Sequence, residues 1–195
     1  MHGYAYSDAL MSMKKRLCLH AFAALLAGLS LQGRAEGDLE WRHRARRGDV
    51  VLTANPQAPA SLSAFYAARG FAAETIRPYA NACGFSLGMR NGGSLPILTR
   101  LADWDVIDAK GRRLKFRLPE SWDADWAKVN APQPARIAFR WAQFQTENTF
   151  EPGDWIMGMA TLESVPTAPF RLIARYHDDK GDHEIVLENL ECARD

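Results

Sequence analysis

The sequence lacks several short motifs that mark common enzyme families. It contains no His-Glu-x-x-His zinc motif, no phosphate-binding loop and no dinucleotide-binding fingerprint. It also contains few histidines, five in 195 residues, so candidates for general acid–base catalysis are scarce. A catalytic carboxylate pair leaves little trace in a sequence, but nothing in this chain points to one. We therefore predict a protein that is not an enzyme and that needs no cofactor.

Neither sign of charge is in excess, because 24 Lys and Arg residues face 23 Asp and Glu residues. This balance excludes the broad basic surface on which nucleic-acid binding depends, so no nucleic-acid partner is expected. One basic stretch stands out at residues 41–47, Trp-Arg-His-Arg-Ala-Arg-Arg. We interpret it as a solvated arm before the first strand, and contact with an anionic membrane or an acidic partner is the alternative.

No apolar run has the roughly 20 residues that a membrane span needs, so a stable span is not expected. A shorter apolar run, residues 17–31, follows three basic residues at 14–16 and precedes small residues at Gly33 and Ala35. This order is typical of a signal peptide that is cleaved after Ala35. Met13 is then the better start, and residues 1–12 are an upstream extension. We expect residues 36–195 to form a single β-rich domain that is periplasmic or secreted.

Cysteines are also few, and only Cys83 and Cys192 follow the predicted signal peptide. In an oxidising compartment two such residues most simply form one structural disulfide. A redox-active or metal-binding pair is the alternative, but such sites usually have cysteines two or three residues apart. The bond would fix the C-terminal strand to the domain.

Short strands separated by turns dominate the rest of the sequence. Residues 170–177 alternate apolar and polar side chains, which is typical of a half-buried strand. Turn signals rich in Gly, Pro, Asn and Asp separate the segments. About eight strands are predicted, at residues 49–54, 84–90, 97–107, 113–118, 136–144, 154–163, 170–177 and 183–192. We expect a mainly β fold, an immunoglobulin-like sandwich of two sheets, with a barrel as the alternative.

One helical insert is predicted near residues 61–82, where apolar side chains recur at three- and four-residue steps. Gly70 interrupts this pattern and is suited to end a helix in the left-handed conformation. The insert is therefore predicted to be two short helices, with Phe71 folded back on the first. The six tryptophans of the chain are interpreted first as core residues.

Two methionines on one predicted strand, Met157 and Met159, provide a candidate metal site. Residues two apart on a strand point to the same side, and soft thioether ligands select Cu(I). Met89, His177 and His183 would complete the site if the fold brings them close. The alternative is that both methionines fill the core, as methionine often does.

Trp122 and Trp126 lie one helical turn apart in the long connector of residues 119–134. Aromatic side chains on such a loop can stack on a sugar or a peptide, which suggests a carbohydrate-binding module. The alternative is that both indoles are buried and attach the connector to the domain.

Together these observations predict a small exported binding or assembly module of the bacterial cell envelope. Its partner would be another envelope protein, engaged through a sheet edge or a loop surface. A periplasmic copper-binding protein and a carbohydrate-binding module remain alternative hypotheses.

Overall fold

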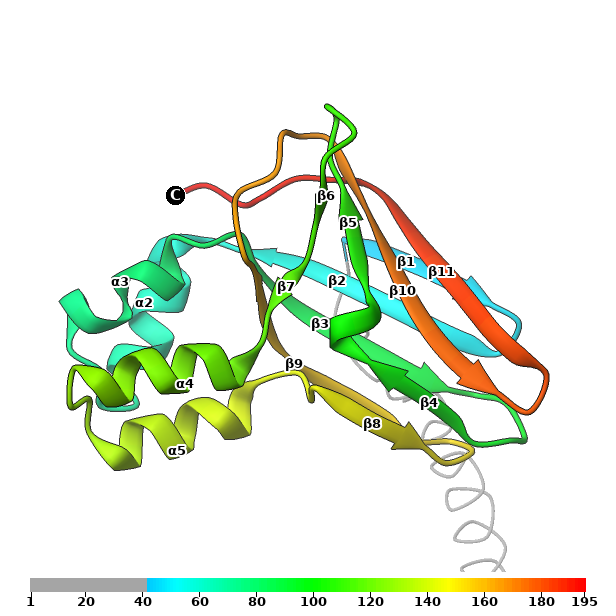
Figure 1. The fold of residues 1–195 in the computed structure, drawn as a ribbon, viewed down its shortest axis with the longest axis horizontal. Coiled ribbons are helices and arrows are strands. Elements are labelled where there is room, and N and C mark those ends of the chain that lie inside the picture. The colour runs from blue at the N-terminus through cyan, green and yellow to red at the C-terminus, as the bar shows by residue number, and fades with distance from the viewer. Residues whose placement is uncertain (1–41) are drawn as a thin grey trace, which may run out of the picture. The chain divides into compact units, whose positions relative to one another are not determined.

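The computed structural model describes residues 42–195, which form two antiparallel β-sheets and four α-helices (Figure 1). The predicted start at Met13, the signal peptide and its cleavage after Ala35 lie outside the described residues. Trp41, the first residue of the basic stretch, also lies outside them. Residues 43–47 of that stretch form the first strand, which pairs with the next one in a tight hairpin, so the interpretation as an arm before the first strand was wrong.

Sheet A, as we call the first sheet, has five strands in the order β1-β2-β3-β9-β7. They are β1 (His43–Arg47), β2 (Val50–Gln57), β3 (Gly84–Asn91), β9 (Trp155–Leu162) and β7 (Phe116–Arg117). Side chains alternate across it: along β3, Phe85 and Leu87 are buried, whereas Arg90 is exposed. One face of the sheet therefore belongs to the core and the other faces outward.

Sheet B has six strands and is built around β10 (Phe170–Asp178). One edge of β10 pairs along its length with β11 (Gly181–Leu190). The other edge pairs with β5 (Asp105–Ile107) and then with β4 (Ile97–Arg100). Beyond these, β6 (Arg113–Leu114) pairs with β5 and β8 (Glu147–Phe150) pairs with β4, so β6, β8 and β11 are the outer strands.

The core of the domain lies between the two sheets. Buried side chains from both sheets belong to one cluster, in which Phe85 of sheet A meets Phe170 of sheet B edge-on at 6.1 Å between ring centroids. Trp104 is fully buried there, and its indole N–H donates to Thr99 Oγ1 and to the Arg175 carbonyl oxygen. Residues 97–107 were predicted as one strand, but a 3-10 turn, η1 (Leu101–Asp103), divides them into β4 and β5.

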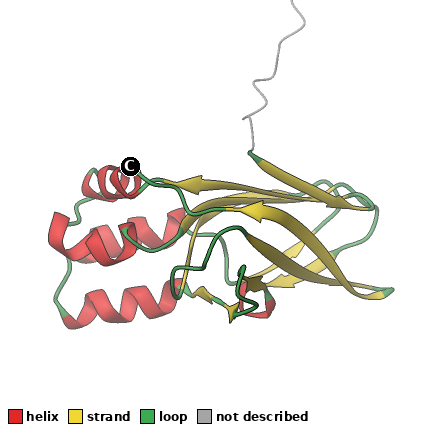
Figure 2. Cartoon of the chain, turned by 90° about the horizontal axis from the view of Figure 1, so that it is seen from above, coloured by secondary structure: helices red, strands yellow, loops and turns green. Residues whose placement is uncertain are grey.

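The four helices lie together at one end of the sheets (Figures 1 and 2). They are α2 (Pro59–Ala67), α3 (Ala73–Ala80), α4 (Pro119–Lys128) and α5 (Gln133–Ala142). Their buried faces form a second apolar cluster rich in aromatic rings, including Tyr66, Tyr79 and Phe139. The predicted division of residues 61–82 is confirmed: Gly70 has φ +94°, and the Phe71 N–H donates to the Tyr66 carbonyl oxygen.

The prediction of a strand at residues 136–144 was wrong, because this segment forms most of α5. Alternating apolar residues suggested a strand, but Ala135 and Phe139, one helical turn apart, are the buried pair. Residues 42–195 therefore contain a second helical segment, at residues 119–142, besides the predicted insert. The mainly β class with two sheets is confirmed, whereas an immunoglobulin-like arrangement is not.

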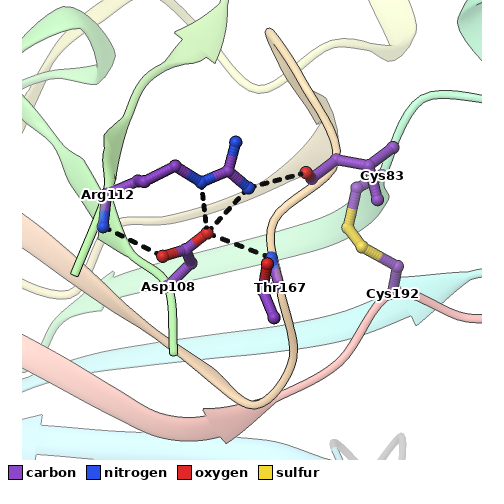
Figure 3. Close-up of a disulfide and its surroundings, with 6 residues drawn as sticks. Cys83, Asp108, Arg112, Thr167 and Cys192 are labelled. Carbon is purple, nitrogen blue, oxygen red and sulfur yellow. Dashed lines mark hydrogen bonds and ion pairs between the residues drawn. A yellow bond between two sulfur atoms is a disulfide. The ribbon is translucent and has the colours of Figure 1, made fainter. Parts of the chain in front are cut away.

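A disulfide joins Cys83, at the start of β3, to Cys192, just after β11, with 2.00 Å between the sulfur atoms (Figure 3). It connects sheet A to the C-terminal segment across 109 residues of sequence. Beyond it, the Asp195 carboxylate accepts the Ala60 N–H at the start of α2, with an N···O distance of 2.8 Å. The C-terminal segment is thus held at both the sheets and the helices.

Asp108, which Figure 3 shows near the disulfide, connects two loops through hydrogen bonds. Its buried carboxylate accepts the backbone N–H groups of Lys110, Arg112 and Thr167, and also the Arg112 Nε–H. Burial alone would raise the pKa of Asp108, but these hydrogen bonds to the charged form lower it to about 2. The β5–β6 hairpin is thereby fixed to the connection between β9 and β10.

Removal of the disulfide is expected to lower the free energy of unfolding by about 4 to 5 kcal/mol, because a loop of about 100 residues regains its entropy in the unfolded chain. The measurement is urea unfolding of a Cys83→Ala, Cys192→Ala variant. Reduced wild-type protein is the matched control and should unfold at a similar urea concentration. Equal midpoints for the oxidised and reduced proteins would contradict this prediction.

Stability is expected to fall as the pH drops from about 4 to about 2. Asp108 binds a proton less readily in the folded chain than in the unfolded chain, where its pKa is about 3.9, so its contribution is complete above pH 4 and is lost toward pH 2. Urea unfolding at several pH values should show a shallower acid decline in Asp108→Asn than in wild type. An equally steep decline in both proteins would show that Asp108 does not contribute.

Candidate functional site

Three of the most exposed large apolar side chains lie on one surface, where α5 meets β9. Trp141 is 86% exposed, Trp155 64% and Met157 44%. Trp155 and Met157 are two residues apart on the outward face of β9, and Trp141 adjoins Met157 from the last turn of α5. We call these three residues the aromatic face.

The sequence of α5 explains why an indole points to solvent there. Prolines at 132 and 134 stand at the start of the helix, where a missing N–H costs little. Phe139 packs edge-on against Trp126, with 4.4 Å between ring centroids, and fills the inward side. Ile137 and Trp141, one turn apart on another side of the helix, are left exposed.

The position of Trp141 in the aromatic face depends on Gly158. A Cβ atom at this position would lie 2.2 Å from the Phe144 backbone nitrogen and 2.5 Å from the Gln143 carbonyl oxygen. The absence of a side chain lets the end of α5 lie directly against β9, where the Phe144 N–H donates to the Met159 carbonyl oxygen. This close approach places Trp141 beside Met157.

A buried polar network supports the same junction. The Gln143 Nε2–H donates to the Tyr66 hydroxyl at 2.6 Å, and the Tyr79 hydroxyl donates to Gln143 Oε1 at 3.1 Å. Burial raises the pKa of Tyr66 to about 12, so its hydroxyl stays protonated at physiological pH. Gln143 thus links α5 to α2 and α3 and limits the movement of the adjacent Trp141.

Two hollows flank the contact between Trp141 and Met157. The first has a volume of about 400 Å³ and is lined by Arg140, Trp141, Gln143, Gln145, Ile156 and Met157. The second, of about 330 Å³, lies between α2, α5 and β9 and includes Phe65, Arg69, Ser86 and Met159. The only charged side chains that line either hollow are Arg140 and Arg69. Arg140 also lies 3.6 Å from the Asp123 carboxylate, but that carboxylate pairs with Arg136 at 2.7 Å as well. Two arginines thus share one carboxylate, and the two hollows keep a positive character.

A larger hollow of about 870 Å³ lies over the outward face of sheet B. Beneath it is Asp105, only 1% exposed, whose carboxylate contacts the Arg113 and Arg175 guanidinium groups and, at 2.9 Å, the Lys115 ammonium. Arg175 also pairs with Glu184 at 2.8 Å.

Burial alone would raise the pKa of Asp105, but hydrogen bonds from Arg175 and Lys115 outweigh it and lower the pKa. Arg100, which also lines this hollow, pairs with Glu147 at 2.5 Å. The cations of the sheet B hollow thus already have carboxylate partners within the domain. We assign this network a structural role, since it joins β5, β6 and β10.

The residues of the hypothetical copper site are not brought together, and Met89 is buried in the core between the sheets. Met157 and Met159 share the outward face of β9, as predicted, and line a hollow on sheet A. His177 and His183 lie on β10 and β11, where they pair with Asp182 and Asp178 and line the hollow over sheet B. Among residues 42–195, no three His, Cys, Asp or Glu side chains are grouped to hold a metal ion.

The proposed stacking pair, Trp122 and Trp126, is buried rather than presented to a ligand. The two indoles are 5% and 3% exposed and stack on each other inside the helical cluster. Their N–H groups donate to Thr161 Oγ1 and to the Thr75 carbonyl oxygen. The alternative interpretation, that they attach the connector to the domain, is therefore correct.

The segment Gly84-Phe-Ser-Leu-Gly88 matches the Gly-x-Ser-x-Gly motif in sequence. Because this motif can carry a nucleophilic serine, its local structure bears on the prediction that the chain is not an enzyme. That motif places its serine on a sharp turn between a strand and a helix. Here Ser86 lies in the middle of β3, paired with Asn55 on one side and Met159 on the other. The local structure of a nucleophile turn is therefore missing.

Sequence reasoning did not find the aromatic face, because tryptophans were interpreted as core residues. Trp104, Trp122 and Trp126 are indeed buried. The exposed Trp141 and Trp155 each follow a charged residue, Arg140 and Asp154, and this was the sequence signal for their exposure. That signal is weak, since Asp105 directly follows the buried Trp104.

Within residues 42–195, no helix is long and apolar enough to cross a membrane. Neither a protein-family model nor a curated protein sequence matches the chain. Among solved structures, the chain is similar to the yjhA protein from Bacillus subtilis, with 12% identity and a TM-score of 0.39. The match covers 67% of this chain and 76% of the other, and at that score it carries no functional argument.

Substitution Gly158→Ala is expected to lower the free energy of unfolding by about 1 to 3 kcal/mol, because backbone atoms at residues 143–144 must move away from β9. Urea unfolding provides the measurement. The matched control is Ser86→Ala on the paired strand, which adds no atoms and should leave the midpoint nearly unchanged. A Gly158→Ala variant as stable as wild type would show that the backbone at residues 143–144 moves away from β9 at little cost in stability.

Proposed function

We propose that this protein is an exported, non-catalytic binding module that docks another protein of the cell envelope through the aromatic face. The observation that carries the proposal is the joint exposure of Trp141, Trp155 and Met157 on one rigid surface. Exposed apolar side chains that occur singly need no explanation, but a group of this size favours a contact site.

The residue types fit a protein partner. Tryptophan and methionine are enriched in protein interfaces, and tryptophan is prominent among the few residues that contribute most of the binding energy. Each large apolar side chain that becomes fully buried contributes about 1.5 to 3 kcal/mol. Because Gln143 and Gly158 hold α5 against β9, little conformational entropy is lost when the face binds.

Three further features support an exported role without catalysis. Residues 14–35 have the order of a signal peptide. A disulfide cross-links the domain, and such bonds are usual in proteins outside the cytosol. The hollow over sheet B, the largest of those described here, has its cations paired with carboxylates of the domain instead of being held ready for a substrate.

Photo-cross-linking in the native envelope tests the proposal. A photoreactive phenylalanine derivative replaces Trp141 or Met157, and the matched control carries it at Val129, which is 65% exposed on another part of the surface. We expect one discrete protein adduct from positions 141 and 157 and none from 129. Equal adducts from all three positions, or none, would contradict the proposal.

The protein identified by cross-linking is then purified and its affinity measured. Trp155→Ala is expected to weaken binding at least tenfold, which corresponds to about 1.4 kcal/mol, and to leave thermal unfolding almost unchanged because the indole is exposed. Val165→Ala, also at an exposed position, is the control and should bind as wild type does. Unchanged affinity in Trp155→Ala would refute the aromatic face as the contact.

A further inference from the structure

Strand β9 has an open edge next to the aromatic face. On one side it pairs with β3 from Trp155 to Thr161. On the other side it pairs with β7 only at Thr161 and Leu162, and residues 143–144 reach it at Met159. Among residues 42–195, no strand pairs with Trp155, Ile156 or Met157 on that second side.

The backbone groups at this edge have a defined direction. In an antiparallel sheet, the N–H and C=O of one residue point to the same neighbour, and the next residue points to the opposite one. The Met159 carbonyl oxygen accepts the Phe144 N–H and so points away from β3. By this alternation, Trp155 and Met157 also direct their N–H and C=O groups to the open side, whereas Ile156 and Gly158 bond to β3.

Other strand edges of the domain are protected in the usual ways. β1 carries arginines at 44, 46 and 47, and β11 carries Asp182, Glu184 and Glu188. The edge strands β6 and β7 are only two residues long. Charge and shortness both prevent unwanted strand pairing. From residue 155 to residue 160, β9 has neither a charged residue nor a proline.

A groove runs along this open edge. It is the hollow of about 400 Å³ that is lined by Ile156 and Met157 of β9 together with Gln143 and Gln145. The two glutamines are polar, and Arg140 supplies the only charge. The groove therefore lies beside unpaired backbone groups of β9 and has a lining of apolar and amide side chains with one positive side chain.

We propose that the partner inserts an extended segment beside β9 as an added strand of sheet A. This inference rests on the proposed function and specifies how the same face binds. Main-chain hydrogen bonds to Trp155 and Met157 supply the pairing, and apolar side chains at alternate positions contact Trp141 and Met157. Aspartate or glutamate in the segment is matched to Arg140 and to Arg69 in the neighbouring hollow.

The occupant is a peptide backbone because of the hydrogen-bonding pattern. A row of alternating donors and acceptors is satisfied by another strand, whereas lipid headgroups carry no such row. A second copy of this chain would bring its own Arg140 and Arg69 to the same surface, which disfavours self-pairing. An acidic and apolar segment of another protein fits both the backbone and the charge.

The test uses twelve-residue peptides selected from a random library on the purified full chain. The selected peptide is then synthesised in two N-methylated forms that differ only in which alternate residues are methylated. One form blocks the N–H groups that face β9, and the other blocks those that face away. We expect the first to lose at least tenfold in affinity and the second to bind nearly as the parent peptide does.

Amide hydrogen exchange followed by NMR provides an independent readout. In the free chain, the amides of Trp155 and Met157 should exchange much faster than those of Ile156 and Gly158. Addition of the selected peptide should slow exchange at Trp155 and Met157 by at least tenfold. Unchanged exchange at these two amides in the complex would overturn strand addition.

A pair of variants at one position tests the same point from the protein side. Met157→Pro removes an N–H that points away from β3, so the β3–β9 pairing is kept. Met157→Leu keeps the N–H and a side chain of similar volume. Peptide affinity should fall at least tenfold in the first and stay within about threefold in the second. If Met157→Pro unfolds, the N-methylated peptides decide the question.

The outcomes separate this inference from the proposed function. Equal binding by the two N-methylated forms, with binding still lost in Trp141→Ala, would overturn strand addition and keep the docking face. Full peptide binding by Trp141→Ala and Trp155→Ala would refute the docking face itself. Three further outcomes would each overturn strand addition. The first is failure to select any peptide, and the second is the formation of concentration-dependent dimers. The third is binding to vesicles of phosphatidylethanolamine and phosphatidylglycerol that is lost in Trp141→Ala.

Discussion

Gly158 allows the chain at Gln143 and Phe144 to approach β9 more closely than any side chain would permit. This contact joins the helical end of the domain to sheet A, since Gln143 also bonds to Tyr66 and Tyr79 inside the helical cluster. The same contact ends strand pairing at Met159, because beyond Phe144 the chain leaves β9 and enters β8 of sheet B. The flanking groove and the open edge of β9 both lie beside this contact.

The outward faces of the two sheets differ in how their charges are satisfied. On sheet B, Asp105 is surrounded by three cations, and Arg175 has Glu184 as a further partner. Such a network needs no external ion. On sheet A, the hollows beside Trp141 contain Arg140 and Arg69 without an acidic residue in their walls. The carboxylate nearest to Arg140, Asp123 at 3.6 Å, is shared with Arg136. This asymmetry favours sheet A as the surface that receives an acidic partner, and sheet B as the face that stabilises the domain.

Much of the fold could be predicted from local patterns. The alternation along β10 and the glycine at position 70 each depend on neighbouring residues alone, and both predictions are confirmed. The helix α5 was missed because its buried side includes Ala135, a small residue that adds little to a hydrophobic pattern. The conflicting alternation of Ile137, Phe139 and Trp141 then suggested a strand, although Trp141 faces solvent.

The features that define the candidate site depend on contacts between distant segments, so sequence patterns do not reveal them. Trp141 lies beside Met157 only where the end of α5 meets β9, although the two residues are far apart in sequence. The open edge of β9 exists only because residues 143–144 leave it after Met159. A strand of Trp, Ile, Met and Gly with no charge has the composition of a central strand.

That composition at an edge carries a risk of aggregation, because unprotected edges pair with other chains. The domain protects its other edges with arginines, carboxylates or short strands and leaves this one without such protection. Exposure of Trp155 and Met157 beside it adds apolar surface to the unpaired backbone. A permanent edge of this kind is compatible with a stable domain when a partner covers it, and this is why we connect the open edge with binding.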